Sequence, residues 1–141
     1  MSPHPTVRVL TQIADERDRQ DEKWGVQNHP SLDPVLTSRD GGCTPERMAE
    51  EYEIPTASRA RFMCQLAAQR GDLSWPQILV EELCEAIEAG VLRGEGPEFR
   101  EELVQAAAVL VAWVECIDRG AEGTADGTQE PEGNDAPPRD C

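Results

Sequence analysis

Residues 97–119 read PEFREELVQAAAVLVAWVECIDR, and this stretch decides the fold class. From Leu103 to Val114 every residue except Gln105 is apolar. These twelve residues are too few to span a bilayer, so they predict a helix from about Pro97 to Arg119 that is buried on nearly all sides. A four-helix monomer of this size rarely encloses one of its helices. We therefore expect a homo-oligomer, a homodimer or a dimer of dimers, in which a partner subunit covers the helix.

The sequence before this stretch also predicts helices, and it contains no alternating strand pattern of useful length. Apolar spacing and capping signals place them at residues 6–24, 46–53, 57–70 and 75–89. Gly71 is expected to be the left-handed cap of the third of these helices. Ser74 and Gln77 have capping-box spacing at the start of the fourth, which Gly90 is expected to end. A Pro/Gly/Asp-rich connection is expected over residues 25–45. The fold class predicted is all-α, a bundle of four to five helices.

Composition excludes several functional classes. The 28 acidic and 13 basic residues give a formal charge of −15, which argues against duplex nucleic acid or an anionic membrane as partner. No apolar run is long enough for a membrane span, and the first twenty residues lack a signal core. The five cysteines form no C-x-x-C pair, which favours reduced thiols. A cytoplasmic location is expected.

The last 22 residues, 120–141, differ from the rest of the chain. They hold four Gly, three Pro and six acidic residues but no large apolar side chain. Such a segment cannot bury enough surface to offset the entropy of ordering. We therefore expect a folded domain over residues 1–119 and a disordered acidic tail over 120–141.

The helix at residues 75–89 places acidic residues close to its apolar side. At 100° per residue, Glu82 falls within the apolar arc and Glu85 lies beside it, whereas Glu81 and Glu88 lie further out. The arc itself comprises Trp75, Ile78, Leu79, Leu83, Ala86 and Ile87. Because an unpaired buried charge is costly, the core-facing carboxylate requires a metal ion, an arginine or both.

The next helix repeats the pattern at Glu102 and Gln105, which are spaced i, i+3 and share a face. If the two helices pack antiparallel, Glu82, Glu85, Glu102 and Gln105 converge. A divalent cation such as Mg²⁺ would relieve the mutual repulsion of their carboxylates. The alternative interpretation is a solvated acidic face, since i, i+3 and i, i+4 acidic pairs are common on helices.

The first helix changes from apolar to polar along one face. Val7, Leu10 and Ile13 begin a stripe that continues into polar residues and an indole. The residues that we expect to contact a base, a sugar or phosphate oxygens are Arg17, Gln20, Lys23, Trp24, Gln27 and His29. The alternative is a helix that frays into solvent, with Trp24 at the edge of the core.

The glutamates together resemble a family motif. Residues 81–85 have the form E-E-x-x-E, and after 16 residues comes Glu102-x-x-Gln105. This order is similar to that of the MazG-like all-α nucleoside triphosphate pyrophosphohydrolases, whose motif is E-E-x-x-E followed by E-x-x-D. Residues 16–29 and 102–109 also look like segments of actinobacterial and phage members, so the resemblance covers residues 10–119. Gln105 departs from the family's Asp and adds no charge for a second metal ion.

The resemblance implies Mg²⁺-dependent hydrolysis of a (d)NTP to (d)NMP and pyrophosphate, with Mn²⁺ as a possible substitute. It assigns metal ligation to Glu82, Glu85, Glu102 and Gln105, and a catalytic role to Glu81 and Glu82. Arg17, Lys23 and either Arg59 or Arg61 would contact phosphate. Some phage members convert dGTP to dGMP for the synthesis of 2-aminoadenine genomes, and that role is one alternative to housecleaning. The alternative from another class is a non-catalytic helical interaction or regulatory protein with the same fold.

Overall fold

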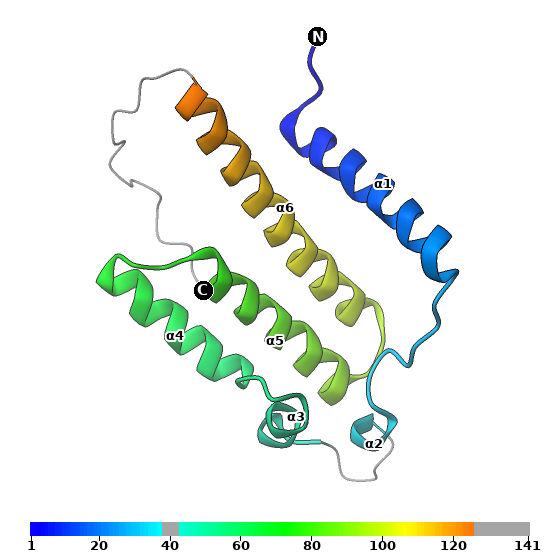
Figure 1. Ribbon diagram of the computed structural model, residues 1–141. Coiled ribbons are helices and arrows are strands. Elements are labelled where there is room, and N and C mark those ends of the chain that lie inside the picture. The colour runs from blue at the N-terminus through cyan, green and yellow to red at the C-terminus, as the bar shows by residue number, and fades with distance from the viewer. Residues whose placement is uncertain (38–42, 126–141) are drawn as a thin grey trace. The chain divides into compact units, whose positions relative to one another are not determined.

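The computed structural model describes residues 1–37 and 43–125, and within them every regular element is a helix (Figure 1). The all-α prediction is therefore confirmed. The helices are α1 (Pro5–Trp24), α2 (Pro34–Thr37), α3 (Pro45–Tyr52), α4 (Ala57–Arg70), α5 (Trp75–Arg93) and α6 (Pro97–Ala125). None of these helices is both long and apolar enough to cross a membrane.

The described residues form two compact units. One consists of residues 1–29 with 110–125, and the other of residues 30–109 without the undescribed segment 38–42. In the first unit, the Thr6 hydroxyl donates a hydrogen bond to Glu115 at 2.5 Å, and Arg8 lies 3.9 Å from Glu122. Contacts of this kind join α1 to the C-terminal part of α6.

The second unit is built on α4 and α5, which lie side by side (Figure 1). Small side chains line their contact: Ala57, Ala60 and Cys84 form one buried cluster. Side chains of this size let the two helix backbones approach closely. A second cluster lies around α2, α3 and the end of α5, and comprises Leu32, Leu36, Cys43, Met48, Val91 and Phe99.

Local sequence signals account for several helix boundaries. The Thr56 hydroxyl caps α4 by accepting from the Arg59 N–H at 3.1 Å, and Gly71 ends α4 in the left-handed conformation (φ 77°, ψ 18°), as expected. The capping box of Ser74 and Gln77 begins α5. The short helix α2 was not expected within residues 25–45. Its signal is Asp33 before Pro34, where the Asp33 carboxylate accepts from the Val35 N–H at 2.9 Å.

Gly90 does not end α5, and this expectation was wrong. A Cβ atom at this position would lie 2.7 Å from Leu32 Cδ1 and 2.8 Å from the Phe99 ring. Gly90 therefore lies inside the helix because two core side chains pack directly on its backbone. The helix continues to Arg93, and Gly94 follows it with φ 95°.

The C-terminal boundary was also placed too early. α6 continues through Gly120 to Ala125, so residues 120–125 are helical. A Cβ at Gly120 would meet no atom within 4 Å, so no side chain packs closely on this glycine. The remainder of the expected acidic tail, residues 126–141, lies outside the described residues.

The single chain does not bury the apolar faces that its sequence predicts. On α6 the side chains of Leu103, Val104, Leu110 and Val114 are exposed, as is Leu83 within the arc expected on α5. Along α1, Val9 is buried, whereas the expected stripe of Val7, Leu10 and Ile13 is exposed. The described cysteines form no disulfide.

Candidate metal centre

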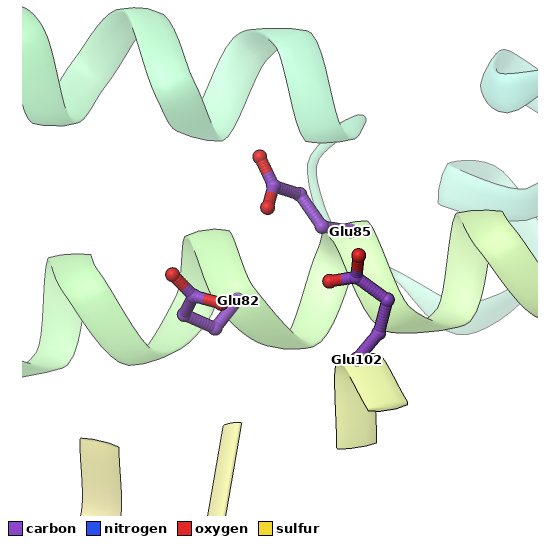
Figure 2. Close-up of side chains that lie close together, drawn as sticks. All are labelled: Glu82, Glu85 and Glu102. Atoms are coloured by element: carbon purple, nitrogen blue, oxygen red, sulfur yellow. The ribbon is translucent and has the colours of Figure 1, made fainter. Parts of the chain in front are cut away.

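Three glutamates converge in the second unit. Glu82 and Glu85 extend from adjacent turns of α5, and Glu102 reaches the same place from the start of α6 (Figure 2). One carboxylate oxygen from each lies within 4.8 Å of the others. The i, i+3 spacing on α5 puts the first two on one face of that helix. The convergence expected for these three residues is therefore present.

Two of the oxygens in this group are buried without a partner. Glu82 Oε2 and Glu102 Oε2 are inaccessible to solvent and receive no hydrogen bond. A buried polar atom without a partner is unfavourable, and a carboxylate oxygen more so than a neutral one. These two oxygens mark where a cation would be stabilised.

Within the three-glutamate group, the pKa values of Glu82 and Glu102 also point to a cation site at these two residues. Burial raises the pKa of Glu82, and the nearby charges of Glu85, Glu81 and Glu102 raise it further. Burial likewise raises the pKa of Glu102, with a smaller contribution from Glu85. Both shifts mean that the ionised carboxylates are held in an unfavourable environment. A divalent cation would lower the free energy of the ionised form.

Glu81 differs from its expected position. Sequence periodicity placed it away from the apolar arc, but its side chain is buried, with the residue 3% exposed. The reason is α4, which covers this side of α5 and brings the Arg61 guanidinium to 3.7 Å from Glu81 Oε1. The same guanidinium lies 2.5 Å from Glu85 Oε1. Arg61 thus joins the two helices through two carboxylates.

Glu88 was also expected to lie further out, and it has a structural role. Its Oε2 accepts a hydrogen bond from the Ala57 N–H at 3.0 Å. The carboxylate therefore satisfies a free N–H in the first turn of α4 and is stabilised by the positive end of that helix. This contact helps to fix α4 against α5 beside the glutamate group.

A polar pocket of about 210 Å³ opens next to the glutamates. It is lined by Ala57, Arg61, Glu85, Glu88, Arg93 and Glu102. Arg93, which the sequence did not single out, pairs with Glu98 at 2.8 Å and lowers the pKa of Glu102, against the larger effect of burial. Its signal in the sequence is its position one residue before Gly94, at the end of α5. The pocket thus offers both carboxylates and guanidinium groups.

Gln105 lies one turn after Glu102 on α6, and its side chain is exposed. Its assignment as a metal ligand stays a prediction. Arg59, the alternative to Arg61 as a phosphate contact, places its guanidinium 5.5 Å from the centre of the Phe62 ring. Of these two arginines, Arg61 is the one that forms ion pairs with Glu81 and Glu85.

A separate pocket of about 360 Å³ lies at the end of α1, within the first unit. Gly25 makes the turn here with φ 68°, and its N–H donates to the Asp21 carbonyl at 2.8 Å. The pocket, called the α1 pocket below, is lined by Arg17, Gln20, Asp21, Trp24, Gly25, Val26, Gln27 and His29. Five of the six residues expected to contact substrate are in this set.

The polar groups of the α1 pocket already interact with one another. Arg17 donates to Gln20 Oε1 at 2.6 Å and to Asp21 Oδ1 at 2.9 Å. Lys23, the sixth expected residue, is not in the lining and places its Nζ 4.7 Å from the centre of the Trp24 ring. The indole is 57% exposed, so it offers surface on which a planar group could stack.

In comparisons with known proteins, no protein-family model matches the chain, and no curated protein or solved structure matches it. The chain is an all-α protein with a group of three glutamates, two of which carry buried, unpartnered oxygens.

Proposed function

We propose that the protein is a divalent-cation-dependent nucleoside triphosphate pyrophosphohydrolase, which converts a (d)NTP to a (d)NMP and pyrophosphate. The observation that carries the proposal is the group of Glu82, Glu85 and Glu102, whose ligand atoms lie within 4.8 Å of one another. The E-E-x-x-E and E-x-x-Q spacing supports it, through the resemblance to MazG-like enzymes.

The donor set fits Mg²⁺, with Mn²⁺ as a substitute. Carboxylate oxygens are the ligands that Mg²⁺ prefers, and a site with few protein ligands leaves coordination positions for water and phosphate. The orphaned oxygens of Glu82 and Glu102 would gain the partner that they lack. Bound there, the cation would neutralise triphosphate charge and make a water molecule more acidic.

The chain's own residues have separate tasks in this proposal. Glu82, Glu85 and Glu102 would hold the cation, and Gln105 would contribute its amide oxygen. Glu81, or Glu82, orients the attacking water and accepts its proton. The water oxygen forms a bond to the α-phosphorus as the bond between this phosphorus and the α–β bridging oxygen breaks. Pyrophosphate departs with the bridging oxygen. Arg61 binds phosphate oxygens, as guanidinium groups commonly do.

The α1 pocket is assigned to the nucleoside. The Trp24 ring provides a stacking surface, and Gln27 and His29 carry hydrogen-bonding groups for the base or sugar. Arg17 and Lys23 are assigned to phosphate, and Gln20 to orienting Arg17, to which it is hydrogen-bonded. Conversion of dGTP to dGMP for a 2-aminoadenine genome is one specific form of the proposal.

A non-catalytic interaction protein is the second candidate. The exposed apolar side chains along α1 and α6 favour it, because contiguous exposed apolar surface marks protein–protein contacts. The homodimer or dimer of dimers expected from the sequence would use such surface and is compatible with either function. It stays a prediction, which light scattering at several concentrations tests.

One experiment separates the two candidates. The full chain is incubated with a panel of (d)NTPs and Mg²⁺ or Mn²⁺, and monophosphate and pyrophosphate are both quantified. The enzyme hypothesis requires equal amounts of the two products and no activity with a chelator. Release of orthophosphate alone, or no product with any nucleotide, contradicts it.

A further inference from the structure

Glu85 is shared between two kinds of positive partner. Its Oε1 pairs with the Arg61 guanidinium at 2.5 Å, and an oxygen of the same carboxylate belongs to the group with Glu82 and Glu102. Arg61 also reaches Glu81 at 3.7 Å. An arginine from α4 therefore supplies positive charge to the acidic group.

Arg61 has room to move. Its side chain is 47% exposed, and it lines the same 210 Å³ pocket as Glu85 and Glu102. A solvated cation can enter through this pocket and approach Glu85 from the side that Arg61 faces. A guanidinium and a divalent cation near one carboxylate repel each other, and this repulsion is poorly screened in a partly buried site.

We propose that Arg61 is the internal counter-ion of the glutamate group, that a divalent cation displaces it from Glu85, and that the released guanidinium then binds phosphate. The inference rests on the proposed function, because it requires a cation at the glutamates. It adds an order of events. The cation binds first and releases the arginine, and the cation and the arginine then bind the polyphosphate together.

This competition has a thermodynamic consequence. Any contact that stabilises the cation-free state alone must be overcome on binding, so its removal tightens binding by the same factor. Replacement of Arg61 by Gln should therefore increase cation affinity, by about fivefold or more for a coupling of typical size. It should lower turnover at saturating cation, because the phosphate contact is lost. A residue with only a structural role would not change these two quantities in opposite directions.

The test is titration calorimetry of Mn²⁺ into the full chain without nucleotide, for the wild type, Arg61→Gln and Arg70→Gln. Arg70 is on the same helix and pairs with Asp72 rather than with the glutamate group, so its replacement controls for the change in net charge. We expect tighter binding for Arg61→Gln and an affinity within about twofold of the wild type for Arg70→Gln, because distant exposed charges are screened.

Thermal unfolding gives a second measurement on the same proteins. The Arg61→Gln variant should unfold at a lower temperature than the wild type with a chelator, and the difference should shrink with saturating Mn²⁺. Equal differences under both conditions, or unchanged or weaker Mn²⁺ binding by the variant, would overturn the displacement model. If Arg61→Gln fails to fold, Arg61→Lys replaces it, and its loss of stability should likewise shrink with Mn²⁺.

The outcomes separate this inference from the proposed function. Absence of Mn²⁺ binding and of pyrophosphate release in the wild type would refute both. A wild type that binds Mn²⁺ and hydrolyses nucleotide, with an Arg61→Gln variant that binds Mn²⁺ no more tightly, would refute the displacement alone.

Discussion

Arg61 Nη2 on α4 lies 2.5 Å from Glu85 Oε1 on α5, and this ion pair links the two helices at the acidic group. Glu85 raises the pKa of the guanidinium above its already high value, so the arginine stays charged at any working pH. The pair places a permanent positive charge beside three glutamates, two of which have a raised pKa.

Glu82→Gln and Glu102→Gln should each abolish catalysis and leave the protein folded. Loss of a ligand removes cation binding, and a decrease in turnover of about a hundredfold or more is expected. Each variant should also unfold up to about 5 °C higher without cation, because one buried repulsive charge is removed. Turnover and thermal unfolding with a chelator check both effects. Glu101→Gln, which removes an exposed charge next to Glu102, is the control, and near-normal turnover in both test variants would contradict the metal assignment.

The stability of the cation-free protein should depend on pH in a defined direction. Burial raises the folded-state pKa values of Glu82 and Glu102 above 4.5, the ordinary value of a glutamate. At a pH between the unfolded-state and folded-state values, the native state therefore binds more protons than the unfolded state. The two carboxylates lower the free energy of unfolding only when they are ionised. This loss of stability is absent below the unfolded-state pKa and complete above the folded-state pKa, so it grows as the pH rises from about 4.5. Thermal unfolding at pH 4.5–7.5 should show this trend as a difference between the wild type and a Glu82→Gln/Glu102→Gln double variant. A constant difference across that range would refute it.

Mg²⁺ binding should weaken as the pH falls through the same window. The cation and protons compete for the same carboxylates, and both raised pKa values shift this competition towards neutral pH. Calorimetric titrations at pH 5 and pH 7 measure it directly. Equal affinities at the two pH values would mean that the cation binds elsewhere.

Gln105→Asp should tighten cation binding. The substitution adds a carboxylate one turn from Glu102, at an exposed position where the added charge costs little desolvation. We expect the Mg²⁺ concentration for half-maximal activity to decrease by several-fold. If Gln105 instead lies in a subunit interface, light scattering should show altered assembly with no change in Mg²⁺ requirement. Unchanged values in both measurements would exclude both roles.

Trp24→Ala should raise KM for nucleotide while kcat changes little. Stacking of a base on an aromatic ring contributes about 1–3 kcal/mol, so an increase in KM of about fivefold or more is expected. Trp24→Phe, which keeps an aromatic face, should restore most of the affinity. Steady-state kinetics with a triphosphate of each base tests the assignment, and an unchanged KM in the Ala variant would contradict the assignment of Trp24 to the nucleoside.

A chain that ends after residue 125 should keep its fold and activity. The removed residues contain no large apolar side chain, and their acidic groups repel a triphosphate. Truncation after Arg119, the boundary expected from the sequence, would also remove the last turn of α6 and the Glu122 partner of Arg8. Turnover of both truncated chains is compared with that of the full chain at low and high ionic strength. Loss of activity at both ionic strengths in the chain that ends after residue 125 would show that the C-terminal residues contribute to the site.

Local sequence patterns predicted the positions of most helices well, but they predicted poorly which residues pack against one another. The bounds of α4 and its Gly71 cap follow from residues adjacent in sequence, and they were predicted correctly. Gly90 was taken for a helix end because its true role depends on Leu32, which is distant in sequence, and on Phe99 of the next helix. Periodicity likewise brought Glu82, Glu85 and Glu102 together but placed Glu81 outside, because it carries no information on which side of α5 the helix α4 covers.

We infer that the glutamate group hydrolyses nucleotides with a bound cation. The most direct measurement is the stoichiometry of products from a (d)NTP panel with Mg²⁺, for the wild type and Glu82→Gln side by side. One pyrophosphate per monophosphate is expected with the wild type, and neither product is expected with the variant. Equal activity of the two proteins, or no pyrophosphate from any nucleotide with the wild type, would contradict it.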